Sequence, residues 1–533
     1  MFRKFRYAKK VHALKSTQPI QKKKTNEKLD SYIYKNFTEL KKIFRNSEDV
    51  KFREFEVYYQ APIKVFICFL EGLVNEDSVN LHVVKSIMEP NSVNGTSPPL
   101  SKDVLSVMKK RIVSISTIEE IDKLSDAVDR VLAGATVIFI DGYQKALSVG
   151  TQGFESRSVE QPDTESLVRG SREGFNEVLK VNCALIRRKI SNPNLIFESI
   201  KLGKQTKTQI RICYIEGIAD SKIVDEVRKR MERIETDSIL ESGYIEQFIE
   251  DHPYSIFPTV GNSERPDKVA SKLLEGRVAI LCDGTPFVLT VPHVFIETLQ
   301  ASEDYYSRPF LSSIMRLLRI IALFLTIGTP AIFVAVATYH HEMVPSLLLI
   351  TMAAAEEKVP FPVFIEALLM VIVFELLREA GVRMPRPVGS AISIVGALVI
   401  GEAAVQAGLV SAPMVIVVAI TGITGFVVSS LNDAIVLSRF ILLFMAGVFG
   451  FYGVLMGTLV LLGHACSLRS FGTPYLAPMA PIVWSEWKDA LVRLPLWTFQ
   501  TRPQSITWSR TKRESPQTKP QQPSSIMKGE NES

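Results

Sequence analysis

Three carboxylates lie inside long apolar stretches of this chain, where an ionisable side chain is costly. Glu366 and Glu375 fall in the stretch 361–380, and Glu402 falls in the stretch 388–409. At the depth of a lipid bilayer a charged group costs several kcal/mol, so it usually faces a bundle interior or a water path. The chemistry expected of such residues is ion handling, which means transport, conduction or signalling across a membrane rather than simple anchoring.

The stretch 388–409 predicts a helix with two distinct faces. One face carries small residues at a spacing of three and four, which lets helix backbones approach closely in lipid. Its helix-packing candidates are Gly389, Ser393 and Gly396. An adjacent face carries the pore and gate candidates Val395, Val399, Glu402 and Gln406. Apolar rings followed by a ring of carboxylates can gate and select ions in an oligomeric pore. A buried polar pair in a tight bundle fits the same spacing, and periodicity alone leaves both interpretations open.

The stretch 361–380 carries an intramembrane polar group made of Glu366, Glu375 and Arg378. Glu375 and Arg378 are one helical turn apart, so we expect them to pair. Glu366 lies deeper, on a different part of the helix surface, and has no local partner in the sequence. It needs a partner on another helix, a water-filled cavity or a bound proton, so a structural hydrogen bond and an ion pathway both stay open.

The elements that would hold these residues form a membrane domain over residues 310–466. Its long apolar stretches reach or come close to the ~20 residues that a spanning helix needs. They are 317–338, 361–380, 388–409, 413–431 and 440–463. The shorter stretch 346–355 is typical of a re-entrant or interfacial segment. Basic residues in short loops mark the cytoplasmic side, and here they place both ends of the domain inside. Five crossings cannot do that, so we expect a sixth crossing or a broken helix, with 346–360 as the first choice.

The region before residue 310 is charged and has the character of a cytoplasmic domain. The chain of 533 residues starts basic, but no apolar segment typical of a signal peptide follows. Lysines crowd a basic, flexible arm over residues 1–50, which either contacts anionic lipid headgroups or is simply solvated. No motif supports nucleic-acid binding. Five scattered cysteines without a CxxC pair predict neither a metal site nor a disulfide framework.

An internal repeat in this soluble half predicts a duplicated unit. Residues 65–74 resemble 210–219 at an offset of 145, and 131–142 resemble 273–284 at an offset of 142. Two matches in the same order favour one duplicated subdomain. The predicted fold class is therefore an α+β soluble N-terminal region with two related αβ subdomains, followed by an all-α polytopic membrane domain. The predicted boundaries are 51–150 and 195–300 for the subdomains, 151–194 for a linker with a charged helix, 467–500 for a cytoplasmic C-terminal segment and 501–533 for a disordered tail.

Each repeat contains an Asp-Gly pair between two apolar runs, at Asp141-Gly142 and at Asp283-Gly284. Asp-Gly in this position is typical of a hairpin turn. Catalysis or metal binding by the two aspartates is the other interpretation, and turn chemistry is the simpler one.

A charged loop lies between the repeats, with the sequence Val168-Arg-Gly-Ser-Arg-Glu-Gly-Phe-Asn-Glu177. It fits neither of the glycine-rich phosphate-binding patterns. We therefore expect Arg169, Arg172 and Glu173 to serve contacts between domains or subunits, with phosphate binding as the alternative.

Beyond these features, the chain resembles the A subunits of the GerA-type spore germinant receptors of endospore-forming bacteria. The resemblance is dense from about 165 to 500 and covers the charged loop just described. It also includes Phe248-Ile-Glu-Asp-His-Pro-Tyr-Ser-Ile-Phe-Pro-Thr-Val260, Glu264-Arg-Pro-Asp-Lys-Val269, Val278-Ala-Ile-Leu-Cys-Asp-Gly-Thr-Pro-Phe287, Glu303-Asp-Tyr-Tyr306, Leu376-Leu-Arg-Glu-Ala-Gly381, Ser393-Ile-Val-Gly-Ala-Leu398 and Ser467-Leu-Arg-Ser-Phe-Gly472. The second of these motifs adds Arg265 and Asp267 to the assembly candidates.

The resemblance implies a multi-pass protein of the inner spore membrane with a cytoplasmic N-terminal domain. Its partners would be a transporter-like B subunit, a lipoprotein C subunit and further copies of itself. Nutrients would bind mainly the B subunit, and the A subunit would form a ring-shaped channel that releases monovalent cations. The alternatives are a stage V sporulation AF-type paralogue, which shares the fold, and a non-conducting scaffold subunit. No nucleophile–base pair, metal cluster or nucleotide loop supports an enzyme, and no cofactor is expected.

Two departures from the family pattern involve three positions. Relatives often carry a carboxylate where this chain has Val371, and they often have Gln near 402 and Glu near 406, where this chain has Glu402 and Gln406. The charge is moved by one helical turn, which predicts an altered ion selectivity or gating threshold.

Overall fold

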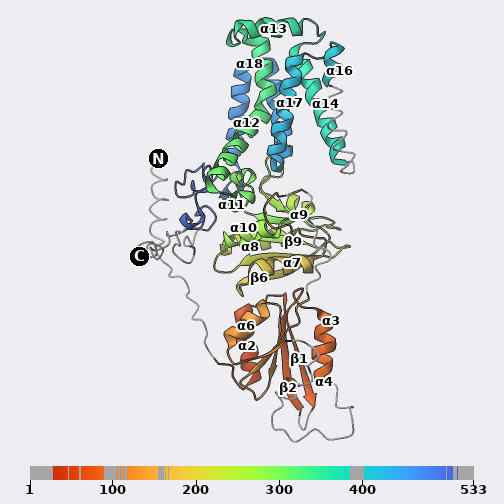
Figure 1. Ribbon diagram of the computed structural model, residues 1–533, viewed down its shortest axis with the longest axis vertical. Helices are drawn as coiled ribbons and strands as arrows, with labels where there is room; N and C mark the ends of the chain where they lie inside the picture. Colours follow the sequence, from red (N-terminus) through yellow and green to blue (C-terminus); the bar gives the residue numbers. More distant parts are fainter. Residues whose placement is uncertain are drawn as a thin grey trace, which may run out of the picture. The chain divides into compact units, whose positions relative to one another are not determined.

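The computed structural model describes most of the chain between residues 28 and 507. The described residues are 28–45, 47–58, 62–88, 105, 108–109, 112, 117–153, 161–162, 164–165, 167–383, 401–499, 501–507 and 513. They form two compact units, which Figure 1 colours along the sequence. Unit 1 comprises 1–249, 260–292 and 501–512, and unit 2 comprises 250–259, 293–500 and 513–533.

Unit 1 contains two five-stranded antiparallel sheets with the same strand order. The strands are β1 (Val50–Tyr58), β2 (Pro62–Leu70), β3 (Ile118–Ile121), β4 (Thr136–Ile140), β5 (Ala146–Val149), β6 (Leu195–Leu202), β7 (Thr208–Ile215), β8 (Gly261–Ser263), β9 (Val278–Cys282) and β10 (Val288–Val291). The first sheet has the order β1-β2-β4-β5-β3, and the second has the order β6-β7-β9-β10-β8. The register also repeats, because Val65 lies opposite Ile140 as Ile210 lies opposite Cys282. The predicted duplication of an αβ subdomain is confirmed.

Helices accompany both sheets. They are α2 (Ile33–Phe44), α3 (Glu76–Ser78), η1 (Val79–Lys85), α4 (Ser86–Met88) and α6 (Leu124–Leu132) in the first subdomain, and α7 (Leu179–Lys189), α8 (Ser221–Glu232), α9 (Ser242–Ile249) and α10 (Pro266–Leu274) in the second. The core of each subdomain is formed by the apolar side chains between sheet and helices, such as Phe66 and Leu40 in the first and Phe197 and Leu185 in the second.

The two Asp-Gly turns have one structural task in common. The carboxylate of Asp141 accepts a hydrogen bond from the backbone N–H of Ile33 at 3.2 Å, and that of Asp283 accepts one from Leu179 at 3.1 Å. These N–H groups belong to the first turns of α2 and α7, where backbone donors lack helical partners. Each aspartate therefore caps the helix that opens its own repeat, and the turn interpretation accounts for both residues.

The capping also shows that each repeat begins earlier than predicted. Helix α2 lies inside the range 1–50 that we expected to be a flexible arm, and its Ile33, Leu40 and Phe44 are buried in the first core. The boundary at 50 is wrong because the basic composition of this segment conceals an amphipathic spacing; residues 1–27 lie outside the described part of the chain. Helix α7 likewise belongs to the second subdomain rather than to a linker.

The C-terminal segment differs from the prediction in the same way. The predicted disordered tail begins at residue 501, yet Ile506 and Thr507 are buried and Arg502 donates to the backbone carbonyl of Leu274 at 3.0 Å. The rest of the tail, apart from residue 513, lies outside the described residues.

Unit 2 is largely helical. Its elements are η3 (Phe295–Leu299), α11 (Glu303–Tyr306), α12 (Pro309–Tyr339), η4 (His341–Met343), α13 (Ser346–Glu356), α14 (Val363–Arg383), α16 (Gly401–Gln406), α17 (Ala412–Val427), η6 (Ser429–Leu431), α18 (Asn432–Ser467), β11 (Arg469–Ser470), β12 (Thr473–Pro474) and η7 (Leu496–Thr498). Among the described residues, α12 and α18 are long and apolar enough to cross a membrane. The segments 250–259, 293–308 and 467–499, which contain only short elements, bond to one another and pack against one end of the helices. We call them the base.

Helix α18 is a hairpin of two arms rather than one straight rod. Gly450 has non-helical angles of φ 58° and ψ −140°. A side chain at Gly457 would collide with Leu442, fifteen residues earlier, at 2.6 Å. Both ends of α18 also reach the base, since Ile435 belongs to the same buried apolar cluster as Leu299 and the ring of His464 lies 3.0 Å from the hydroxyl of Ser255. A straight helix of 36 residues would be about 54 Å long and could not do this.

The hairpin supplies the additional reversal of the chain that the sequence predicts. The additional crossing or broken helix is predicted within 346–360, but that range holds the short helix α13, and the break lies at Gly450. The five glycines of the run 440–463 indicate flexibility but do not identify which of them reverses the chain. Consequently, the segment that follows α18 returns to the base, where the chain of unit 2 also enters α12.

Candidate functional site: polar groups within the helical bundle

A buried polar cluster joins four helices of unit 2. Arg439 of α18 is 1% exposed, and its guanidinium lies 2.5 Å from the carboxylate of Glu375 on α14. The same guanidinium donates to the backbone carbonyl of Thr326 at 2.9 Å and to its hydroxyl at 3.1 Å. The Thr326 hydroxyl on α12 in turn donates to the carbonyl of Thr421 on α17 at 3.0 Å. Arg439 therefore joins α12, α14 and α18, and Thr326 extends the cluster to α17.

The predicted pair of Glu375 and Arg378 is confirmed, with an N–O distance of 2.7 Å. Glu375 thus pairs with two arginines, Arg378 on its own helix and Arg439 on α18. Arg439 is absent from the candidates predicted from sequence, because it lies just before the apolar run 440–463, where a solvated flanking residue is expected. An arginine one residue before a membrane-type run, in a chain with carboxylates in other runs, is the signal that could have found it.

Glu366 also finds its partner on another helix. Its carboxylate, 1% exposed, accepts hydrogen bonds from the hydroxyl of Ser411 at 2.7 Å and from the backbone N–H of the same residue. Ser411 is the residue that precedes α17, so Glu366 satisfies a donor at the positive end of that helix. Of the options left open by the sequence, the interhelical hydrogen bond is the one observed.

The pore and gate candidates are only partly described. Glu402 and Gln406 lie on α16 with exposed side chains, and the Gln406 amide donates to the Glu402 carboxylate at 3.1 Å. Val395, Val399, Gly389, Ser393 and Gly396 lie outside the described residues. Glu402 is therefore the one carboxylate of the original three that has no ion pair or interhelical bond among the described residues.

The assembly candidates divide into buried and exposed members. Arg265, 2% exposed, donates to the backbone carbonyls of Glu165 at 3.2 Å and Ser171 at 3.1 Å and pairs with Asp267 at 2.8 Å. It therefore fastens the charged loop inside the second subdomain. Arg169 and Arg172 are exposed.

Glu173, the third loop residue, is also held within the subdomain. It pairs with Lys189 at 2.8 Å and with Arg188 at 3.2 Å. Its hydrogen bond with Lys189 holds the pKa of this carboxyl below its ordinary value. Of the five assembly candidates, only the two exposed arginines are available for contacts with another molecule.

A charged interface joins the two subdomains of unit 1. Arg187 of α7 and Asp49 are both almost fully buried, and the guanidinium makes two hydrogen bonds of 2.9 Å to the carboxylate. Nearby, the Glu71 carboxylate forms ion pairs with Arg211 and Lys180, at N–O distances of 2.9 Å and 3.0 Å. Burial alone would raise the pKa of Glu71, but the hydrogen bonds from Arg211 and Lys180 outweigh it and lower the pKa. These pairs hold the repeats in a fixed relation.

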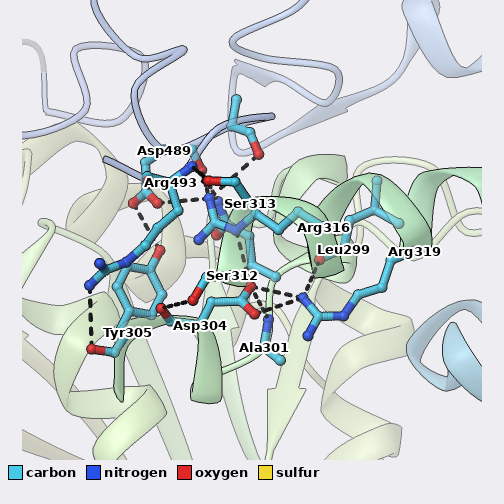
Figure 2. A network of polar contacts seen from close by, with 12 residues as sticks. Leu299, Ala301, Asp304, Tyr305, Ser312, Ser313, Arg316, Arg319, Asp489 and Arg493 are labelled. Carbon is cyan, nitrogen blue, oxygen red and sulfur yellow. Dashed lines mark hydrogen bonds and ion pairs between the residues drawn. The ribbon is translucent and has the colours of Figure 1, made fainter. Parts of the chain in front are cut away.

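A second buried network lies at the base, where the chain enters α12 (Figure 2). Arg316 and Arg319 of α12 both bond to Asp304, at 3.0 Å and 2.8 Å. Arg316 also pairs with Asp489 at 2.9 Å, which draws the segment 489–493 against the helix. This network is not evident in the sequence, because its members are spread over almost 190 residues of the chain.

Unit 1, with its duplicated αβ subdomain, is of the soluble type, and unit 2, with its apolar helices and buried ion pairs, is of the membrane type. Residues 38–505 match the family model described as Bacillus/Clostridium GerA spore germination protein. The chain belongs to this family. Among the described residues, no group of three or more His, Cys, Asp or Glu side chains is arranged to hold a metal ion.

Characterised and uncharacterised relatives share most of this length. The chain is 45% identical to spore germination protein KA of Bacillus subtilis (strain 168), over 89% of this chain and 87% of that protein. It is 44% identical to the uncharacterized membrane protein YfkQ of the same strain, over 88% and 90%, and 37% identical to GerLA of Bacillus cereus, over 90% and 96%. The crystal structure of the N-terminal domain of the A subunit of the Bacillus megaterium germinant receptor GerK3 is 35% identical, covers 51% of this chain and 98% of that chain, and has a TM-score of 0.40.

Proposed function

We propose that this protein is a membrane subunit of a nutrient-responsive spore germinant receptor. Three relatives with germination names cover most of the chain, and one further relative is named a membrane protein. Helices α12 and α18 are suited to cross a bilayer, and the hairpin at Gly450 returns the chain to the side on which it entered α12. The protein would be a multi-pass protein of the inner spore membrane, with unit 1 on the cytoplasmic side.

Within that receptor we infer a ring-forming, ligand-gated cation channel. The observation that carries this proposal is the exposure of Glu402 and Gln406 on α16. Glu366 and Glu375 have protein partners inside one chain, whereas Glu402 is bonded only to Gln406 among the described residues. A carboxylate that faced lipid would cost several kcal/mol, so this face turns to water or to another copy of the chain. A ring of copies around a water-filled path provides both.

Opening and closing of the path is assigned to Val395 and Val399. Rings of such apolar side chains close a pore by dewetting, and the neighbouring ring of Glu402 carboxylates would favour cations. Nutrient binding would fall to a transporter-like B subunit, with a lipoprotein C subunit as the third member. A stage V sporulation AF-type paralogue would share this architecture and differ in its partners.

The test is the conductance of the purified protein in planar bilayers, alone and with its candidate partner subunits. Cation currents that depend on the partners and on nutrient support the proposal. A protein that inserts, assembles with its partners and carries no current in any combination is a scaffold subunit instead.

A further inference from the structure

The segment that supplies Asp489 and Arg493 to the network at the base also carries exposed apolar side chains, tryptophans among them. Three of the four tryptophans of the chain fall within residues 482–497. Exposed fractions in this segment are 58% for Ile482, 73% for Trp484, 52% for Val492, 56% for Leu496 and 41% for Trp497. A water-soluble surface rarely presents so many large apolar side chains along one short segment. Something other than water covers this surface in the functional protein.

The first turns of α12 continue the same surface. The Ser313 hydroxyl of α12 accepts from the backbone N–H of Arg493 at 3.1 Å and lies 3.3 Å from its carbonyl, so the two segments lie side by side. Phe310, one turn before Ser313, is 87% exposed, and Ile314, which follows Ser313, is 56% exposed. Val492 and Leu496 flank the contact from the other segment. We call the exposed apolar residues of 310–318 and 482–497 the foot.

Buried charges fix the foot rigidly to the helix. Figure 2 shows Arg316 reaching Asp489 and Asp304, and Tyr305 donating to Asp489 at 2.8 Å. The guanidinium carbons of Arg316 and Arg493 lie 5.5 Å and 5.6 Å from the centre of the Tyr305 ring. A segment held by such contacts cannot withdraw its exposed side chains without breaking a buried network.

We propose that the foot lies in the interfacial layer of the membrane that α12 enters, with Trp484 and Trp497 among the lipid headgroups. Tryptophan is enriched at this depth, because its ring combines an apolar body with a polar N–H group. The exposed Lys488 and Arg308 suit the polar side of that layer, since their stems are apolar and their charged ends reach water.

The dimensions of α12 fit this position. From Ile314 to Tyr339 the helix rises about 38 Å at 1.5 Å per residue, close to the ~40–45 Å that a bilayer measures with its headgroups. Tyr339 is 46% exposed at the far end of the helix. Aromatic side chains would thus mark both membrane surfaces, and the foot would set the depth of α12.

The experiment is depth-dependent quenching of tryptophan fluorescence in the full-length protein. A chain with Trp487, Trp497 and Trp508 replaced by Phe retains Trp484 as its single fluorophore. It is reconstituted into phosphatidylcholine–phosphatidylglycerol vesicles whose lipids carry bromine either near the headgroup or near the chain end. We expect stronger quenching by the shallow bromine than by the deep one, a blue-shifted emission and reduced quenching by aqueous iodide.

Two control chains separate this inference from the proposed membrane location on which it rests. Each carries one new tryptophan in an otherwise tryptophan-free chain. Phe324→Trp, at an exposed position in mid α12, should be quenched best by the deep bromine, and Tyr58→Trp, on β1 of unit 1, should be quenched by iodide alone. If Phe324→Trp behaves so but Trp484 responds only to iodide, or to neither quencher, the foot faces water or protein and the inference fails.

A further probe covers the case in which the tryptophan replacements disturb folding. Leu496→Cys, in a chain with Cys466→Ser so that no other exposed cysteine among the described residues reacts, is labelled with bimane. Shallow quenching of this label supports the foot, and a label quenched by iodide as strongly as one on Tyr58→Cys overturns it. If neither the Phe324→Trp chain nor the foot probes respond to any brominated lipid, the proposed membrane location itself is wrong.

Discussion

Glu375 on α14 and Arg439 on α18 form an ion pair inside the bundle, although 64 residues separate them along the chain. The arginine is 1% exposed and also bonds twice to Thr326 on α12. A buried guanidinium of this kind is stable only while its carboxylate and carbonyl partners are in place. The pair therefore fixes the relative positions of three helices.

Removing one member of this pair should weaken the bundle strongly. We expect Glu375→Leu to cost about 3–5 kcal/mol, because it leaves Arg439 buried without its counter-charge. Thermal unfolding in detergent measures the effect. Glu379→Leu is the matched control on the same helix, since Glu379 forms an exposed pair with Arg383 and exposed pairs contribute about 0–1 kcal/mol.

The double variant Glu375→Leu with Arg439→Met is a sharper test of the same idea. Apolar side chains of similar size often replace a buried pair without loss, so much of the stability should return. A double variant that is as unstable as the two single losses added together would show that the residues act independently.

The reversal of the chain at Gly450 should depend on glycine. Its φ of 58° with ψ of −140° is accessible to few side chains, and an added Cβ would lie 3.0 Å from the Tyr339 ring. We expect Gly450→Ala to cost about 1–3 kcal/mol and to lower the yield of folded protein. Gly463→Ala in the same run is the control, because nothing lies within 4 Å of its added Cβ.

If Gly450→Ala is as stable as Gly463→Ala, the turn does not need glycine and the assigned hairpin geometry is wrong. A maleimide reaction at Cys466, which is exposed near the end of the second arm, reports whether that arm keeps its place.

The junction of the two subdomains should weaken at low pH. The pKa of Glu71 lies below its ordinary value of 4.5, so its contribution is fully present above pH 4.5 and is lost as the pH falls through the lower, folded-state pKa. We expect Glu71→Gln to cost about 1–3 kcal/mol near neutral pH, because Arg211 and Lys180 lose a charged acceptor. Calorimetry of both proteins at neutral pH and well below pH 4.5 measures the difference. A gap between them that stays constant across this range would contradict the assigned role of the Glu71 charge.

Assembly should depend on the exposed part of the charged loop. Reversal of charge in Arg172→Glu is expected to shift the protein toward smaller species, while unit 1 keeps its fold because the side chain is exposed. Mass measurement of the detergent-solubilised protein checks this, with Arg233→Glu, another exposed arginine of unit 1, as the control. Normal assembly combined with loss of phosphate binding would instead favour a phosphate-binding loop.

The sequence predicts the duplicated subdomains, the local pair of Glu375 and Arg378 and the interhelical need of Glu366, because each depends on local spacing or on repetition. It does not predict Arg439, the base network or the break at Gly450. These features depend on contacts between segments that are far apart in the chain, and a single sequence does not show which segments come together. The boundaries at 50 and 501 fail for a related reason, since a basic or proline-rich composition hid a few well-placed apolar residues such as Leu40 and Ile506.

In the proposed channel, the face of Glu402 lines a cation path that is gated by Val399. The most direct measurement is the reversal potential of the currents that the purified protein carries in a planar bilayer under a potassium chloride gradient. We predict a cation-selective potential for the native chain, a shift toward zero for Glu402→Gln and spontaneous leak for Val399→Ala, with Glu379→Gln unchanged. Native selectivity and closure in both Glu402→Gln and Val399→Ala, at normal protein levels, would rule out the segment 388–409 as the pore lining.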